Sequence, residues 1–263
     1  MRQPFYLGTF SFAVMSFSFA LPALAADTLF SIGAGVEYTN GTYGASQATH
    51  ILNTSVNVKL ESGDHTVKLT LPYLVVSAPA GGKVITVDDK GRAVRDGDGD
   101  LITESGQGDV MASYGYNLLD DRTSGTVLDA VAKIKFGTAN VSKGLGTGKN
   151  DHAFQLDLAK TLASFTALGT LGYKVLGEPV GVNFDNIWFG SVGASYRYSG
   201  MGSVGLVYDY RQAATATNEA QREVSAYHST KTDGGNRFQI YVLKGYSKSS
   251  PDWGAGLAFT ATY

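Results

Sequence analysis

The chain of 263 residues contains no cysteine, which excludes a disulfide framework and any metal site built on thiolates. It also lacks a large excess of charge of either sign. Its 21 Lys and Arg residues stand against 23 Asp and Glu residues, for a formal net charge of −2. Because there is no strong basic field, we expect no nucleic-acid partner.

Two further absences bear on membrane crossing and on catalysis. Beyond residue 25 there is no apolar run near the roughly 18–20 residues that a membrane-spanning helix needs. A mature chain that crosses a membrane would therefore do so as strands. The chain also has no Gly-x-Ser-x-Gly nucleophile elbow.

The N-terminus has the pattern of a secretory signal. Arg2 supplies a positive start, residues 5–21 are mostly apolar, and Ala23-Leu24-Ala25 is a small-x-small cleavage site. The alternative is a retained transmembrane helix, which Pro22 and the cleavage pattern disfavour. We predict a signal peptide over residues 1–25 and one mature domain over residues 26–263.

Alternation of period two recurs along the mature chain. In the last segment, Trp253, Leu257 and Phe259 share one face with Tyr263, while glycine, alanine and threonine occupy the other. Such alternation predicts strands, and this segment has about the length that crosses a bilayer at a tilt. Similar segments fall at 30–38, 52–60, 66–75, 110–118, 128–136, 154–158, 165–175, 188–198, 204–210, 222–231 and 238–242.

The connections between these segments predict the architecture. Short links, such as 62–64 and 199–201, alternate with longer ones, of which residues 77–106 are the longest. This alternation is typical of an outer-membrane barrel with short periplasmic turns and longer outer loops. We predict an all-β fold: a closed antiparallel transmembrane β-barrel of about 12 strands. Residues 77–106 form a long outer loop with a hairpin at 84–94. A two-sheet soluble sandwich is the alternative.

The polar faces of the predicted strands carry many charged side chains, which suits a wet lumen better than a dry core. The predicted lumen-lining residues are Glu37, Lys59, Lys68, Asp109, Asp129, Lys133, Lys135, Asp157, Arg197 and Arg211, with Lys174 and Asp209 on the same faces. Where neighbouring strands bring Asp109, Asp129 or Asp157 beside the lysines, we expect a ladder of opposite charges. It would serve either as a structural plug or as a selectivity filter.

Two loop motifs resemble ligand sites without matching them. Residues 96–100 place carboxylates at alternate positions, but Leu101 and Gln107 stand where a calcium loop needs glycine and glutamate. We interpret them as an acidic solvated loop, with a weak divalent site as the minor alternative. Residues 144–149 lack the outer glycine and the final Ser or Thr of a phosphate-binding loop. We predict a mobile surface loop there.

The four histidines give little support for catalysis. Asp151-His152 is the only adjacent acid–histidine pair, and neighbouring residues on a strand point to opposite faces. We therefore predict that the protein is not an enzyme and has no catalytic residue, no metal site and no cofactor.

Several short motifs resemble the outer-membrane proteins of the meta-pathway phenol-degradation type. They are Leu71-Pro72-Tyr73, Gly106-Gln107-Gly108-Asp109-Val110, and Ser250-Pro251-Asp252-Trp253-Gly254 leading to the terminal tyrosine. One departure is Phe136-Gly137-Thr138, where such proteins tend to have a proline-threonine-glycine step. The resemblance implies an outer-membrane barrel that passes small, often aromatic or apolar, compounds.

These observations predict a passive channel in the cell outer membrane, with a small-molecule solute and with membrane lipid and lipopolysaccharide as partners. The 77–106 loop would gate or filter the lumen. The first alternative is a closed structural or surface-interaction barrel. The second is an outer-membrane barrel hydrolase that uses a loop histidine such as His152.

Overall fold

The computed structural model describes residues 28–263 apart from 46, 81–83, 88–92, 96–98 and 233. The predicted signal peptide therefore lies outside the described residues. The strands are β1 Thr28–Gly41, β2 Thr49–Ser62, β3 His65–Pro79, β4 Val84–Val87, β5 Ala93–Arg95, β6 Leu101–Gln107, β7 Val110–Asp121, β8 Thr126–Phe136, β9 Asp151–Leu162, β10 Phe165–Val175, β11 Ile187–Arg197, β12 Gly202–Arg211, β13 Gln221–Lys231, β14 Arg237–Gly245 and β15 Trp253–Thr262. No helix in the described part of the chain is long and apolar enough to cross a membrane.

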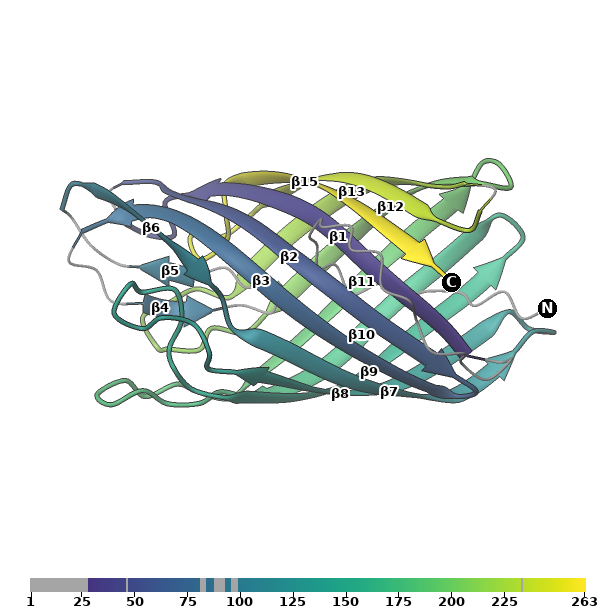
Figure 1. The fold of residues 1–263 in the computed structure, drawn as a ribbon, viewed down its shortest axis with the longest axis horizontal. Coiled ribbons are helices and arrows are strands. Elements are labelled where there is room, and N and C mark those ends of the chain that lie inside the picture. Colours follow the sequence, from purple (N-terminus) through teal and green to yellow (C-terminus); the bar gives the residue numbers. More distant parts are fainter. Residues whose placement is uncertain (1–27, 46, 81–83, 88–92, 96–98, 233) are drawn as a thin grey trace.

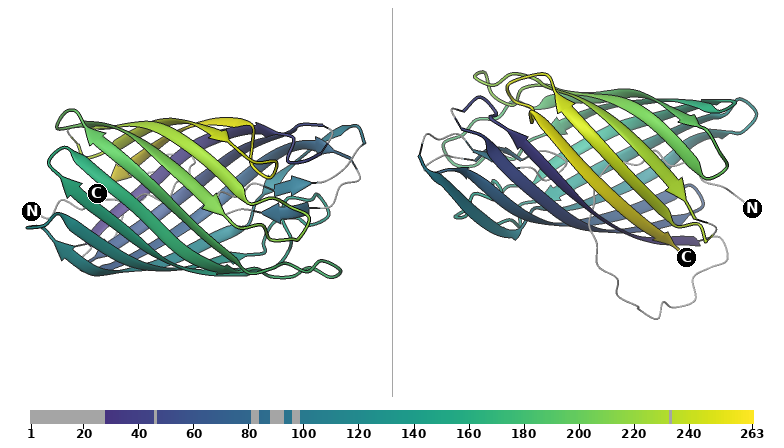
Figure 2. Two further views of the ribbon diagram at one scale, coloured as in Figure 1. Left: turned by 180° about the vertical axis from the view of Figure 1, so that it is seen from behind. Right: turned by 90° about the horizontal axis from the view of Figure 1, so that it is seen from above.

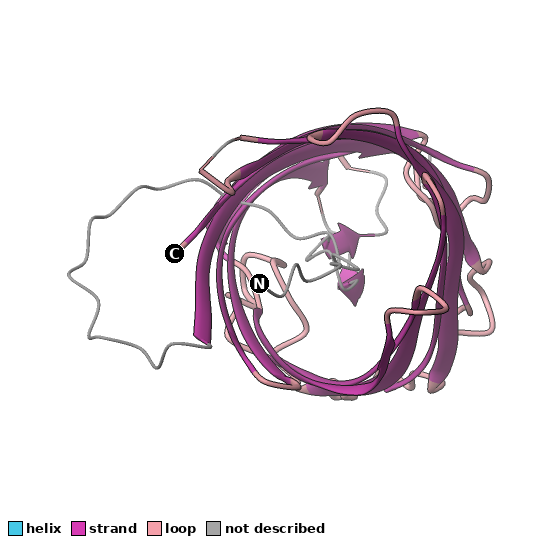
Figure 3. Ribbon diagram, turned by 90° about the vertical axis from the view of Figure 1, so that its right-hand side faces the viewer, coloured by secondary structure: helices cyan, strands magenta, loops and turns pink. Residues whose placement is uncertain are grey.

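Twelve of these strands form a closed antiparallel barrel, and β6 adds a thirteenth strand to the same sheet. Each of the twelve barrel strands pairs with the next barrel strand in the chain, β3 pairing with β7, and the ring closes where β1 pairs with β15. Figure 3, which looks along the barrel, shows the strands as a ring. The predicted twelve-stranded barrel is confirmed. Closure pairs the backbone groups of the strands with one another, as a hydrocarbon environment requires.

The strand between β3 and β8 is divided by a bulge. Tyr73 of β3 pairs with Gln107 of β6, but Thr70 pairs with Met111 of β7, so this strand holds one extra residue opposite β3. The irregularity lies opposite Pro72, which has no N–H to donate, and its carbonyl accepts a bond from the N–H of Gly108. The bulge places Asp109 just before β7.

The short and long connections lie at opposite ends of the barrel, as predicted (Figures 1 and 2). The short turns lie at the end that holds the C-terminus; Gly125, with φ 69°, completes the turn between β7 and β8. The long connections lie at the other end, here called the mouth: residues 42–48, 80–100, 137–150, 176–186, 212–220 and 246–252.

Part of the predicted 77–106 loop is strand. β3 extends to Pro79, and residues 101–107 return beside it as β6. The predicted hairpin is confirmed, with Thr86 of β4 opposite Val94 of β5. This hairpin lies at the mouth and inside the ring seen along the barrel, with β5 against β2 and β3 (Figures 1 and 3).

The outer face of the barrel is an apolar belt edged with aromatic side chains. Leu171, Val192, Leu206 and Val242 lie in its middle and are each more than half exposed. Aromatic pairs lie toward both ends, with ring centroids about 5 Å apart: Tyr38–Trp253 and Tyr173–Trp188 near the mouth, and Phe165–Tyr196 near the turns. Such a belt between two aromatic girdles is the surface of a membrane-spanning barrel.

Candidate functional site: the inner wall and the mouth

The inner wall is polar because the other face of each strand carries hydroxyl, amide and charged groups. Ser31, Asn53, Asn57, Gln155 and Ser225 on this face are all buried. They alternate along their strands with the exposed apolar residues of the belt. A polar inside and an apolar outside are the reverse of a soluble barrel.

Register places the ten predicted lumen residues on this one face, at different depths. Lys59 on β2 is the direct partner of Lys68 on β3, and Asp129 on β8 is the partner of Asp157 on β9. The others are Glu37 on β1, Asp109 before β7, Lys133 and Lys135 on β8, Arg197 on β11 and Arg211 on β12.

Four buried charges form a ladder of salt bridges near the mouth. The Nζ of Lys135 lies 2.8 Å from Oδ2 of Asp109 and 3.4 Å from Oδ2 of Asp151. The same oxygen of Asp151 lies 3.3 Å from Nζ of Lys174. The four side chains are at most 6% exposed. Opposite charges alternate across β8, β9 and β10, so each carboxylate has a cation beside it.

This ladder differs in membership from the expected one. Asp109 and Lys135 belong to it, but Asp157 does not. The carboxylate of Asp157 instead accepts hydrogen bonds from neutral groups: Nε2 of Gln155 at 2.6 and 2.7 Å and the hydroxyl of Thr170 at 2.6 Å. Asp129 likewise accepts a bond from Asn117, at 2.7 Å. The ladder is completed by Asp151 and Lys174. Period-two alternation extended upstream from Phe154 would have placed Asp151 on the inner face.

A side-chain hydrogen bond joins β14 to β1 across β15 on the inner wall. The Tyr241 hydroxyl donates a hydrogen bond to Glu37, and both side chains are buried. Between them lies Gly256, the register partner of both. A Cβ on this glycine would lie 2.4 Å from the tyrosine ring, so the absence of a side chain lets the ring lie flat over β15.

The connection 137–150 folds into the mouth instead of extending outward. Leu145 is fully buried in an apolar cluster with Ile51, Leu74, Val76, Ala78 and Ala139. The loop is also tied to the bulge, because the N–H of Ala139 donates to Oδ1 of Asp109 at 2.9 Å. The predicted mobile surface loop over 144–149 is therefore wrong at residues 144–146, which are buried. One leucine among glycines carries too little periodicity to reveal this burial.

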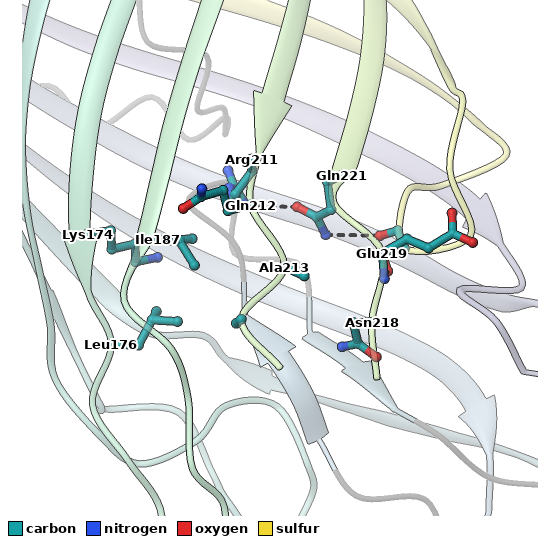
Figure 4. A pocket seen from close by; sticks show the side chains of 11 residues that line it. Lys174, Leu176, Ile187, Arg211, Gln212, Ala213, Asn218, Glu219 and Gln221 are labelled. Atoms are coloured by element: carbon teal, nitrogen blue, oxygen red, sulfur yellow. Dashed lines mark hydrogen bonds between the residues drawn. The ribbon is translucent and has the colours of Figure 1, made fainter. Parts of the chain in front are cut away.

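A small pocket of mixed polar and apolar lining lies at the mouth (Figure 4). Lys174 and Ile187 lie on one side of it, and Arg211 lies on another. Arg211 donates from Nη1 to Oε1 of Gln221 at 3.0 Å, and Gln221 donates in turn to the carbonyl of Ser249. The pocket brings Lys174, Arg211 and the acidic Glu219 to one place at the mouth.

Three histidines face outward and contact aromatic residues. His50 bonds Tyr38, His65 bonds Tyr114 and His228 bonds Tyr198, at 2.6–2.8 Å. His152 also lies on the outer face, because it follows the inward Asp151 on β9. These two residues therefore do not form an acid–histidine pair, as the alternation argument predicted.

The described residues hold no group of three or more histidine, aspartate or glutamate side chains arranged to bind a metal. Residues 96–98 of the acidic motif lie outside the described residues.

A search of family models returned no match to this sequence, and neither did a search of the curated proteins. Among solved structures, the chain is similar to the COG4313 outer membrane channel from Pseudomonas putida F1. The two share 13% identity over 95% of this chain and 100% of that one, with a TM-score of 0.64. At this identity the similarity concerns the fold.

Two further structures with lower scores are a monoaromatic hydrocarbon channel, CymD, and the P. putida toluene transporter TodX. Each is 10% identical, with TM-scores of 0.46 and 0.45; CymD covers 90% of this chain and 88% of its own, and TodX 91% of both. Scores this low support no closer relation. The resemblance drawn from the sequence motifs is thus confirmed at the level of the fold, which is that of an outer-membrane channel.

Proposed function

We propose that the protein is a passive outer-membrane channel for small molecules. The observation that carries this proposal is the polar inner wall of a closed barrel whose outer face is an apolar belt. Lipid and lipopolysaccharide cover the belt, and the charged residues of the inner wall line the path of the solute. The fold shared with a known outer membrane channel supports the same function.

The mouth acts as the filter in this proposal. The 137–150 connection packs Leu145 onto the inner wall, and the β4–β5 hairpin lies inside the ring (Figure 3). A segment that narrows the entrance selects solutes by size and by polarity.

Single-channel conductance of the refolded chain from residue 26 onward, in a planar bilayer, tests this function. Discrete and reproducible current steps are expected. A correctly folded but silent barrel would contradict a conducting pore. It would favour the second candidate, a closed structural barrel, which the buried charge ladder and the Leu145 cluster support.

A deletion tests the filter separately. Removing residues 81–98 takes away the hairpin and leaves β3 and β6 paired. The deletion is expected to raise the conductance. A conductance equal to that of the intact chain would reject the hairpin as a filter and leave the channel itself in place.

A further inference from the structure

A row of direct register partners on the inner wall gathers lysines from separate strands. Lys59 on β2 is opposite Lys68 on β3, which is opposite Ser113 on β7, which is opposite Lys133 on β8. Lys68 interacts electrostatically with both of the other lysines. Lys59 also carries a salt bridge of 2.8 Å to Glu61. Three lysines from separate strands therefore lie on one patch of the wall, with Glu61 beside Lys59.

The same row continues to the entrance pocket. Lys133 is opposite Ala153 on β9, and Ala153 is opposite Lys174 on β10. Lys59 lies near the turn end of the barrel because β2 ends at residue 62, whereas Lys174 lies next to the last residue of β10 at the mouth. The row thus rises along the inner wall from the turn end to the pocket that Arg211 shares with Lys174.

Two carboxylates of the wall, those of Asp129 and Asp157, follow a different row. On β8, Asp129 lies four residues from Lys133, about 13 Å along the strand. Asp129 is the partner of Asp157, and both accept hydrogen bonds from neutral donors of the wall. Glu61, which pairs with Lys59, is an acidic side chain beside the lysine row, whereas Asp129 and Asp157 lie apart from it. Cations placed side by side repel one another, and a bound anion offsets that repulsion.

We propose that Lys59, Lys68 and Lys133 form an anion-binding subsite on the inner wall, and that the solute class is a small organic carboxylate. The carboxylate enters past Arg211 at the mouth and moves along the inner wall to these three lysines. Lysine provides a strong point charge for such an ion, and its flexible stem allows transfer to the next site. This inference rests on the proposed function, since it names the solute of the same channel.

Two measurements on the refolded chain test this subsite. The first is the anion-to-cation permeability ratio, from the reversal potential in a KCl gradient, for the unaltered chain and for K68Q/K133Q. The second is calorimetric titration of the detergent-solubilised barrel with benzoate and with neutral benzamide. The controls are K244Q, an exposed lysine on the outer face of β14, and K68R/K133R, which keeps both charges.

We expect K68Q/K133Q to lower the permeability ratio about fivefold, the factor that corresponds to one aqueous contact between unit charges at about 4 Å. It should also abolish benzoate binding, while both controls resemble the unaltered chain and benzamide binds to none of them. A conducting barrel with an unchanged ratio would overturn the subsite and leave the channel in place. A silent barrel would reject the channel, and benzoate titration would then decide the subsite: binding lost only in K68Q/K133Q supports it, and absent or unaffected binding overturns it.

Discussion

Individual charged residues stabilise the inner wall by forming buried salt bridges with one another. Lys135 is the clearest case, because its ammonium lies between the carboxylates of Asp109 and Asp151. Removing one partner of a buried ion pair leaves a charge that is poorly compensated. The sequence predicted the alternation of charge here, but the choice of partners depended on register.

The replacement Lys135→Met is therefore expected to lower the free energy of unfolding by about 3–5 kcal/mol. The matched control is Lys143→Met, whose side chain is 45% exposed and lies 3.8 Å from Glu104; its cost should stay within about 1 kcal/mol. Urea unfolding in phospholipid vesicles measures both. Equal losses for the two variants would show that burial of the ladder does not matter.

At Gly256 the packing of the inner wall depends on the absence of a side chain. The variant Gly256→Val would force the Tyr241 ring off β15 and break its hydrogen bond to Glu37. A loss of about 1–3 kcal/mol is expected for such overpacking. Ala255→Val, on the outer face of the same strand, is the control. The same unfolding assay would contradict this account if the two valines cost the same.

At the scale of elements, strands follow from local pattern whereas loops do not. Period-two alternation predicted the barrel strands because each strand has one face toward lipid and one toward polar surroundings. The 137–150 connection has no such repeat. Its inward fold depends on Leu145 meeting apolar side chains of β2 and β3, which are distant in sequence.

The variant Leu145→Ser should release this connection from the wall. A buried leucine lost from such a cluster costs about 2–5 kcal/mol, and here the cost falls on the docking of the loop. Hydrogen exchange of the amides over 137–150 is expected to accelerate, and the single-channel current to increase. Val141→Ser in the same connection, where the side chain is 57% exposed, should change neither. Slow exchange retained in Leu145→Ser would show that the loop is held by other contacts.

At the scale of the whole molecule, the bilayer acts as the solvent for the outer face. Val192 is 63% exposed in the middle of the belt, whereas Val180 is 99% exposed in a mouth connection. Arginine in place of Val192 should lower the free energy of unfolding in vesicles by about 2–4 kcal/mol, the cost of a charge near the bilayer midplane. Val180→Arg should cost little. Comparable costs at the two positions would contradict the placement of the belt in the membrane.

The whole-barrel architecture was largely predictable from the sequence. Periodicity and turn composition, which are local properties, predicted the number of strands and the alternation of short and long connections. They also predicted an even number of strands, which brings both ends of the chain to the same side. The bulge opposite Pro72 and the division into β6 and β7 were not predictable in detail. They depend on which residues of β3 and its neighbour face each other.

The sequence by itself thus determined an all-β chain with an apolar outer face, a charged inner face and its long connections at one end. Tertiary structure alone decided which charges meet and which loop enters the mouth. The physical reason is that side-chain alternation is set residue by residue, whereas salt bridges such as Lys135 to Asp109, and the burial of Leu145, require strands far apart in sequence to be brought into register.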